Sequence, residues 1–108
     1  MDEFSWFVGL WEGEGTVQKD GKNIVLEIKM TDEDVIARAA KYLGVSYCEK
    51  KVAKPHYKPS YRVRVKGGCT RGKLYDLLMK MKPHVSKRRK EQIDTKLNML
   101  VTEQKTKL

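Results

Sequence analysis

Residues 7–15 read FVGLWEGEG, and the interpretation of the whole chain starts from this stretch. Its apolar residues, together with those just before it, recur at helical spacing and predict a helix over residues 4–13. One face of this helix carries Phe4, Phe7, Val8 and Trp11. The opposite face carries Trp6, Gly9, Leu10 and Gly13. The helix is therefore apolar on two sides.

The second apolar face needs a partner, because a helix at the surface of a small domain buries only one face. Glycines at positions 9 and 13 would let another backbone come close. We expect a dimer interface formed by Trp6, Gly9, Leu10 and Gly13. The alternative is a central helix that is buried on both sides within its own domain.

Turn signals predict a hairpin directly after this helix. Gly15 is expected to end the helix, as a glycine just past a last turn does. Asp20-Gly21 is a hairpin signal between two strands. The second of these strands, residues 24–30, alternates apolar and polar residues with a period of two.

A second helix and a second hairpin follow. Thr31 with Asp34 is typical of a capping box at a helix start, and Gly44 is expected to end that helix. Strands are predicted over residues 45–53 and 60–66, and two further helices follow them. The order helix, strand, strand, helix, strand, strand, helix, helix indicates one layered α+β domain spanning the chain.

Composition narrows the classes of function. The chain has 108 residues, of which 40% are hydrophobic and 34% charged, with a net charge of +9. These values exclude a membrane protein, a disulfide scaffold and a multidomain enzyme, and they favour a nucleic-acid partner. Residues 1–34 are acidic on balance and residues 35–108 are strongly basic. The two cysteines and two histidines lack the clustering of a zinc site, and reduced thiols indicate an intracellular protein.

The stretch FVGLWEGEG resembles the motif of the LAGLIDADG homing endonucleases. Gly9, Leu10 and Gly15 match that motif, Glu12 and Glu14 replace its two aspartates, and Gly13 takes its small-residue position. The element order over residues 4–105 also fits the family. The resemblance implies an αββαββα core with an additional C-terminal helix, in which each chain is one half of a saddle on DNA.

In this family, proteins with a single motif are homodimers. The resemblance therefore implies a homing endonuclease, encoded in an intron or another mobile element, that binds a long, near-palindromic duplex site. Such a protein would act in a bacterial or phage-infected cytoplasm or in an organelle. It would cut both strands by Mg²⁺-dependent phosphodiester hydrolysis and leave 3′ overhangs. Mn²⁺ is expected to substitute for Mg²⁺, and Ca²⁺ to support binding without cleavage.

Glu14 is the expected catalytic acid and metal ligand. A carboxylate at the C-terminal end of a helix is disfavoured by the helix dipole, so a cation should compensate it. Mg²⁺ accepts one or two carboxylates together with waters and phosphate oxygens, and the carbonyl of Gly13 could add a ligand. The alternative for Glu14 is a solvated acid in a loop.

Two further catalytic roles follow from the resemblance. Family members place a basic residue near the scissile phosphate, and Lys87 or Arg88, within the basic run 87–90, is the expected equivalent. Asp32 or a neighbour is expected at the position that organises water after the second strand, where an acid instead of a neutral amide is a departure. The basic run could instead be a solvated helix start or a targeting signal.

Strand alternation predicts a DNA-binding sheet face. If Ile24, Leu26, Ile28 and Met30 face the helices, Val25, Glu27 and Lys29 face outward. Similarly, Arg62, Arg64 and Lys66 would project outward from the later strand. The candidate base readers are Gln18, Asn23, Lys29, Arg62 and Arg64. The candidate phosphate contacts are Lys22, Lys50, Lys51, Lys54, Lys58 and Lys66. An ordinary solvated sheet face is the alternative.

Two rival functions remain open on the same fold. One is a non-catalytic DNA-binding regulator, although retention of the acid at position 14 favours the nuclease. The other is a maturase that binds intron RNA, because a basic surface alone does not separate DNA from RNA.

Overall fold

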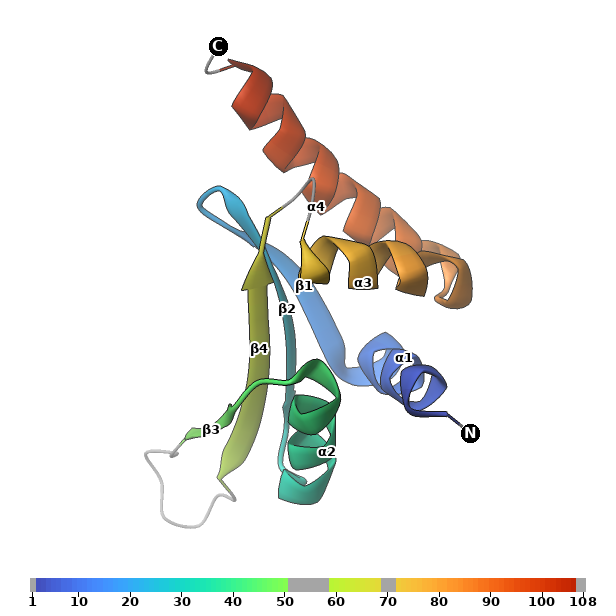
Figure 1. Ribbon diagram of the computed structural model, residues 1–108, viewed down its shortest axis with the longest axis vertical. Helices are drawn as coiled ribbons and strands as arrows, with labels where there is room; N and C mark the ends of the chain where they lie inside the picture. The colour runs from blue at the N-terminus through green and yellow to red at the C-terminus, as the bar shows by residue number, and fades with distance from the viewer. Residues whose placement is uncertain (1, 51–58, 69–71, 107–108) are drawn as a thin grey trace. The chain divides into compact units, whose positions relative to one another are not determined.

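The computed structural model describes residues 2–50, 59–68 and 72–106, the last eight of these by their backbone alone. This part of the chain forms four α-helices, one 3₁₀ helix and a four-stranded antiparallel sheet (Figure 1). The predicted α+β class and the order αββαββα followed by an additional helix are confirmed.

The elements are, in order, α1 (Glu3–Glu14), β1 (Gly15–Asp20), β2 (Asn23–Met30), α2 (Glu33–Leu43), β3 (Tyr47–Lys50), β4 (Ser60–Gly67), α3 (Lys73–Met81), the 3₁₀ helix η1 (Lys82–His84) and α4 (Lys87–Thr106). The strands pair in the order β1-β2-β4-β3, so β2 and β4 are the inner strands of the sheet. The tight turn between β1 and β2 is the predicted Asp20-Gly21 hairpin, and Gly21 supplies its positive φ of 61°.

The chain divides into two compact units, each with its own buried side chains. The first unit is Met1–Gly15 with Glu27–Val65. Its buried apolar residues are Phe7, Val8 and Trp11 of α1, Ile36, Ala39 and Ala40 of α2, Ile28 and Val63. Phe7 also stacks on Tyr42 of α2, with ring centroids 5.0 Å apart. The predicted core face of the first helix is thus buried, with Phe4 half-buried at its start.

The second unit is Thr16–Leu26 with Lys66–Leu108. Its buried apolar residues are Val17 of β1, Ile24, Val25 and Leu26 of β2, Leu74, Leu78 and Met81 of α3, and Ile93 and Leu97 of α4. Each helix contributes residues spaced three or four apart, which is the pattern of one buried helical face. Pro83 lies in η1 and separates α3 from α4, as the sequence indicated.

The expected capping box at the start of α2 is wrong. The N-cap is Asp32, not Thr31, and its side chain makes no capping hydrogen bond in the part of the chain described. The end of α2 is as expected, because Gly44 is its C-cap with a φ of 72°. The helix therefore begins one residue later than a Thr31 cap would place it.

Two expectations about the strands need correction. Val25 was expected to face outward with Glu27 and Lys29, but only 2% of it is exposed. Its neighbours Ile24 and Leu26 are buried as well, so both faces of β2 are covered at this point and strict alternation fails there. The third strand was predicted over residues 45–53; the described part runs over Tyr47–Lys50, and residues 51–53 lie outside the described residues.

Candidate functional site

The end of α1 fixes the position of the motif acid. Glu14 is the last residue of the helix and is exposed, and β1 begins with the next residue. Among the described residues it has no recorded side-chain partner. The dipole of α1 disfavours a carboxylate there, as the sequence indicated.

Gly15 ends α1 for a reason that differs from the expected one. Its φ of −90° and ψ of 167° are extended backbone that any residue can adopt. Space is what demands glycine, since a Cβ at this position would lie 2.1 Å from Cδ1 of Trp11. The indole of Trp11 is fully buried and cannot move away freely. The close approach of the Trp11 indole therefore requires glycine at the first residue of β1, immediately after Glu14.

The second face of α1 is open. Trp6 and Leu10 are half-buried, and Gly9 and Gly13 are exposed. A Cβ built on either glycine would meet no atom of the described residues within 4 Å. Glycine in a helix interior lowers folding stability by about 0.5–1 kcal/mol relative to alanine. No contact within the described chain requires glycine at these two positions.

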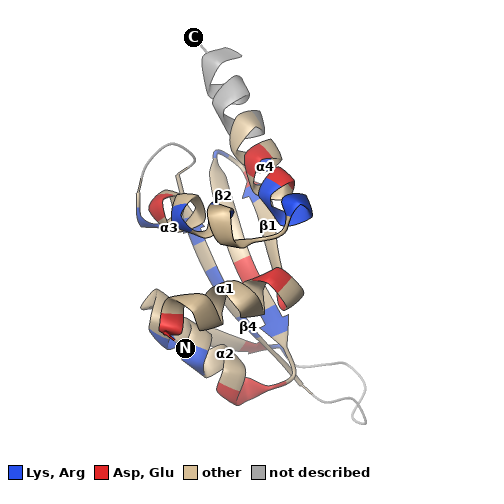
Figure 2. Ribbon diagram, turned by 90° about the vertical axis from the view of Figure 1, so that its right-hand side faces the viewer, with Lys and Arg blue, Asp and Glu red and all other residues tan. Residues whose placement is uncertain are grey.

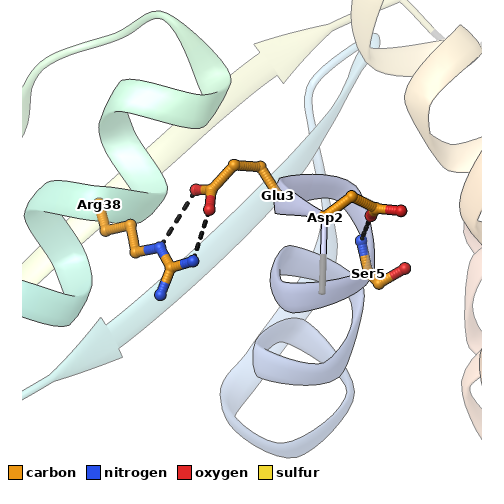
Figure 3. A network of polar contacts seen from close by, with 4 residues as sticks. All are labelled: Asp2, Glu3, Ser5 and Arg38. Carbon is orange, nitrogen blue, oxygen red and sulfur yellow. Dashed lines mark hydrogen bonds and ion pairs between the residues drawn. The ribbon is translucent and has the colours of Figure 1, made fainter.

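An arginine of α2 borders this open face. The guanidinium of Arg38 donates from Nε and Nη2 to the two carboxylate oxygens of Glu3, over 3.1 and 2.5 Å (Figure 3). Its Cζ also lies 4.0 Å from the ring centroid of Trp6. The hydrogen bond from Arg38 lowers the pKa of Glu3 below its ordinary value. At the start of the same helix, Asp2 accepts from the backbone N–H of Ser5 over 2.7 Å, which caps α1.

The register of β3 and β4 shows which side chains of the first unit lie on the sheet face opposite to the buried Val63, which is called the outer face here. Tyr47 lies opposite the buried Val63, and Cys48 lies opposite Arg62. Directly opposite residues point to the same face, so Arg62 projects away from the face of Val63. Nε of Arg62 lies 3.4 Å from Oε1 of Glu27 on β2, an ion pair that the sequence did not indicate.

The other predicted readers of the first unit are exposed. Lys29 of β2 and Arg64 of β4 are exposed, each two residues along its strand from a member of the Glu27–Arg62 pair. Lys50 of β3 is also exposed. The register places Lys50 opposite Ser60, which is on the same face as Arg62. The structure thus brings Lys29, Lys50, Arg62 and Arg64 to one face.

The predicted contacts of the second unit lie on β1, its hairpin and the end of β4. Gln18, Lys22 and Lys66 are exposed, and Asn23 is half-buried. Lys66 is 2.9 Å from Oδ2 of Asp20, so this cation also meets an acid on a neighbouring stretch of chain. Lys51, Lys54 and Lys58 lie outside the described residues.

Basic residues gather at the start of α4 (Figure 2), and one residue of the run 87–90 is buried, unlike its neighbours. The predicted catalytic candidates Lys87 and Arg88 are exposed, whereas only 8% of Arg89 is exposed. Nη1 of Arg89 donates to Oε1 of Gln92 over 3.0 Å, and its backbone N–H donates to Oγ of Ser86 over 3.3 Å. Sequence reasoning treated this run as one cluster and missed the distinction.

Arg89 lines a hollow of about 350 Å³ within the second unit. The remaining lining residues are Thr16, Val17 and Gln18 of β1 with Gln92 and Lys96 of α4. The three residues of α4 follow at intervals of three and four, which is the spacing of one helical face. This spacing, read together with the run 87–90, is the signal that could have found the hollow from the sequence.

No group of three or more His, Cys, Asp or Glu side chains that could hold a metal occurs within the described ranges. Asp32, the expected water-organising residue, is exposed at the N-cap of α2. No helix in the described part of the chain is long and apolar enough to cross a membrane.

Comparison with known proteins gives one match. A family model described as "LAGLIDADG-like domain" matches residues 2–79, from the N-cap of α1 to the last turns of α3. No curated protein and no solved structure matches the chain. The matched region contains Glu14 and both hairpins, and α4 with the hollow residues Arg89, Gln92 and Lys96 follows it.

Proposed function

Because this chain belongs to the LAGLIDADG-like family of homing endonucleases and maturases, we propose that it is a site-specific DNA endonuclease that acts as a homodimer. One observation carries the proposal. Glu14 presents an exposed carboxylate at the end of α1, next to a helix face whose two glycines have open space beside them. A structural helix end would favour a basic residue at this position.

A second copy of this chain is the partner that fits the open face. Gly9 and Gly13 lie one helical turn apart and leave the backbone of α1 accessible, which suits packing against an identical helix. Trp6 and Leu10 flank these glycines and supply apolar area. Two helices packed in this way would bring two copies of Glu14 together, which makes the pair of sites needed to cut both strands.

The donor set at the end of α1 suits Mg²⁺. Glu14 offers a carboxylate and the helix end offers the carbonyl of Gly13, which has no following helical turn to bond. Both are hard oxygen donors, and Mg²⁺ commonly takes one or two carboxylates along with waters and substrate phosphate oxygens. When bound, the ion would polarise the scissile phosphate and lower the pKa of a bound water.

The remaining roles belong to residues of the chain itself. Lys87 or Arg88, exposed in the first turn of α4, would stabilise the charge that develops on the phosphate. Asp32 would orient the attacking water by accepting a hydrogen bond from it, since its carboxylate is not used to cap α2 in the described structure. We assign Glu12 no catalytic role.

The outer sheet face would read the DNA. Arg62 and Arg64 suit guanine edges in the major groove, and Gln18 and Asn23 suit adenine. Lys29 completes the set of proposed base readers. The lysines of the hairpin and the strand ends, Lys22, Lys50 and Lys66, would contact the DNA backbone and fix the register.

The test is cleavage of a randomised duplex pool that also contains the sequence flanking the native gene. Wild type, Glu14→Gln and Glu12→Gln are compared in Mg²⁺ and in Ca²⁺. Glu12→Gln is the matched control, because it makes the same change two residues earlier on α1. We expect defined cuts with wild type and Glu12→Gln in Mg²⁺ only. Cleavage by Glu14→Gln at the wild-type rate would contradict the assignment of the acid.

Two other outcomes would favour the rival functions. Sequence-selective retention of duplex DNA without cleavage in Mg²⁺ or Mn²⁺ would indicate a regulator. Tighter binding to the host intron RNA than to any duplex DNA at matched salt would indicate a maturase.

A further inference from the structure

The hollow between β1 and α4 combines burial with positive charge. It has a volume of about 350 Å³ and is lined by six residues, two of them basic and none acidic among those described. Arg89 and Lys96 supply the two charges. A concave site with one sign of charge concentrates the electrostatic potential and attracts ions of the opposite sign.

Arg89 is held in this hollow in a defined orientation. Only 8% of the residue is exposed, and its Nη1 donates to Oε1 of Gln92. This hydrogen bond uses the carbonyl oxygen of the Gln92 side chain, and the NH₂ group of the same amide is its hydrogen-bond donor. A guanidinium held in this way already has a defined orientation, so binding of an anion orders it at a lower entropy cost than an exposed arginine.

The lining chemistry matches a phosphodiester group. Guanidinium, ammonium, amide NH₂ and hydroxyl groups are the side chains that donate to phosphate oxygens in protein–DNA complexes. Arg89, Lys96 and Gln92 supply the first three of these groups, and Thr16 of β1 adds the hydroxyl. Thr16 is separated from Glu14 by Gly15 alone, so the chain itself joins the hollow to the end of α1.

We propose that this hollow binds one backbone phosphate of duplex DNA and thereby positions the strand. The inference rests on the proposed DNA-binding function and extends it to residues beyond the region matched by the family model. Arg89 and Lys96 contact the phosphate, and Gln92 orients Arg89. They are positioning residues, whereas the catalytic roles stay with the residues proposed above.

The decisive variant is Gln92→Glu. It keeps the size of the side chain and the acceptor for Arg89, so the helix and the buried arginine stay in place, but it adds a negative charge to the hollow. Asn98→Asp is the matched control, because it makes the same amide-to-acid change at an exposed position of α4 outside the hollow.

The first measurement is duplex DNA binding as a function of salt. Each phosphate contact contributes about −0.9 to the slope of log K against log salt, so one contact is worth about fivefold in affinity between 1 M and 0.15 M salt. We expect Gln92→Glu and Lys96→Gln each to reduce the slope by about one and to weaken binding about fivefold or more at 0.15 M. Asn98→Asp should change the slope by less than half as much. Equal effects of Gln92→Glu and Asn98→Asp would overturn the proposal.

The second measurement does not require DNA binding. Inorganic phosphate is titrated into the wild-type protein while the backbone amide signals of Thr16 and Gln18 are followed by NMR. We expect saturable shifts that Gln92→Glu abolishes and Asn98→Asp retains. Absence of shifts in the wild type would overturn the proposal.

The two measurements separate this inference from the proposed function. If wild type binds and cuts DNA but Gln92→Glu keeps the wild-type salt slope, the hollow is not a phosphate site and the nuclease assignment stands. If wild type binds no duplex DNA, the proposed function fails, and phosphate shifts at Thr16 would still identify an anion site. If duplex RNA gives the slope change and DNA does not, the proposal for DNA is wrong.

Discussion

Replacing Gly9 by alanine tests how the open face of α1 is used. Gly9 is exposed in the middle of α1, and an added Cβ would meet no atom of the described residues within 4 Å. The single chain therefore has room for the methyl group. If a second copy packs its own α1 against this face, the same methyl group enters an interface in which the glycines allow close approach. The substitution should act in opposite directions on folding and on self-association.

The two effects differ enough in size to be separated. Within the single chain, the change from glycine to alanine should raise the free energy of unfolding by about 0.5–1 kcal/mol. This corresponds to a rise in Tm of about 2–8 °C for a domain of this size. In a dimer each copy adds one methyl group to a packed interface, at about 1–3 kcal/mol apiece. The dimer Kd should then weaken by a factor of roughly thirty or more.

The assay combines sedimentation over a range of concentrations with thermal unfolding of dilute protein. Ser5→Ala is the control, since Ser5 is exposed on α1 and its substitution raises helix propensity without adding bulk to the glycine face. We expect Ser5→Ala to leave the dimer Kd unchanged. A dimer of Gly9→Ala with the wild-type Kd would refute the proposed interface, and a lower Tm of its dilute monomer would refute the packing argument.

Three further predictions concern stability. Gly15→Ala should lower the free energy of unfolding by about 1–3 kcal/mol or more, because its Cβ would collide with the buried indole of Trp11; an unchanged urea midpoint would contradict this. Arg38→Gln should lower Tm slightly at neutral pH. The pKa of Glu3 is lowered from 4.5, so the stabilisation holds above that pH and is lost as the pH falls through the lowered value. The Tm difference should therefore shrink in a pH series below about 4.5, and a difference that grows there would count against the pair. Gly44→Ala should cost about 1 kcal/mol in urea unfolding because its φ is 72°, whereas a neutral result would indicate that the turn relaxes.

The parts of the fold that the sequence predicted depend on local signals. The two-faced first helix, the Asp20-Gly21 hairpin and the glycine that ends α2 are each specified by residues close together in the chain. The structure has these elements where their residue spacing predicts them, because helix and turn geometry is set by residues a few positions apart. The burial of Val25 departed from the predicted alternation, because the exposure of a strand face depends on what packs over the sheet and not on the sequence of that strand alone.

The features of the candidate site that the sequence missed involve partners distant in the chain. Arg38 and Glu3 are 35 positions apart in the sequence, and Arg62 and Glu27 have the same separation in the sequence. The burial of Arg89 depends on its position on α4 and not on the run in which it occurs. Such pairings depend on how the elements assemble, and no spacing rule within one element indicates them.

Three ion pairs connect the acidic residues 1–34 with the basic remainder of the chain. Residues 1–34 carry most of the acids, and several of these bind basic residues from the later part of the chain: Glu3 with Arg38, Asp20 with Lys66, and Glu27 with Arg62. The acidic segment thus neutralises selected cations, and two of these are among the proposed DNA contacts. A phosphate offers only hydrogen-bond acceptors, and the carboxylate beside the basic side chain repels it. The edge of a nucleobase can instead present a donor to the carboxylate and an acceptor to the basic side chain. If Arg62 reads bases as proposed, its pairing with Glu27 lowers its attraction for the DNA backbone and leaves contacts to base edges favoured, which suits a protein that selects one site among many.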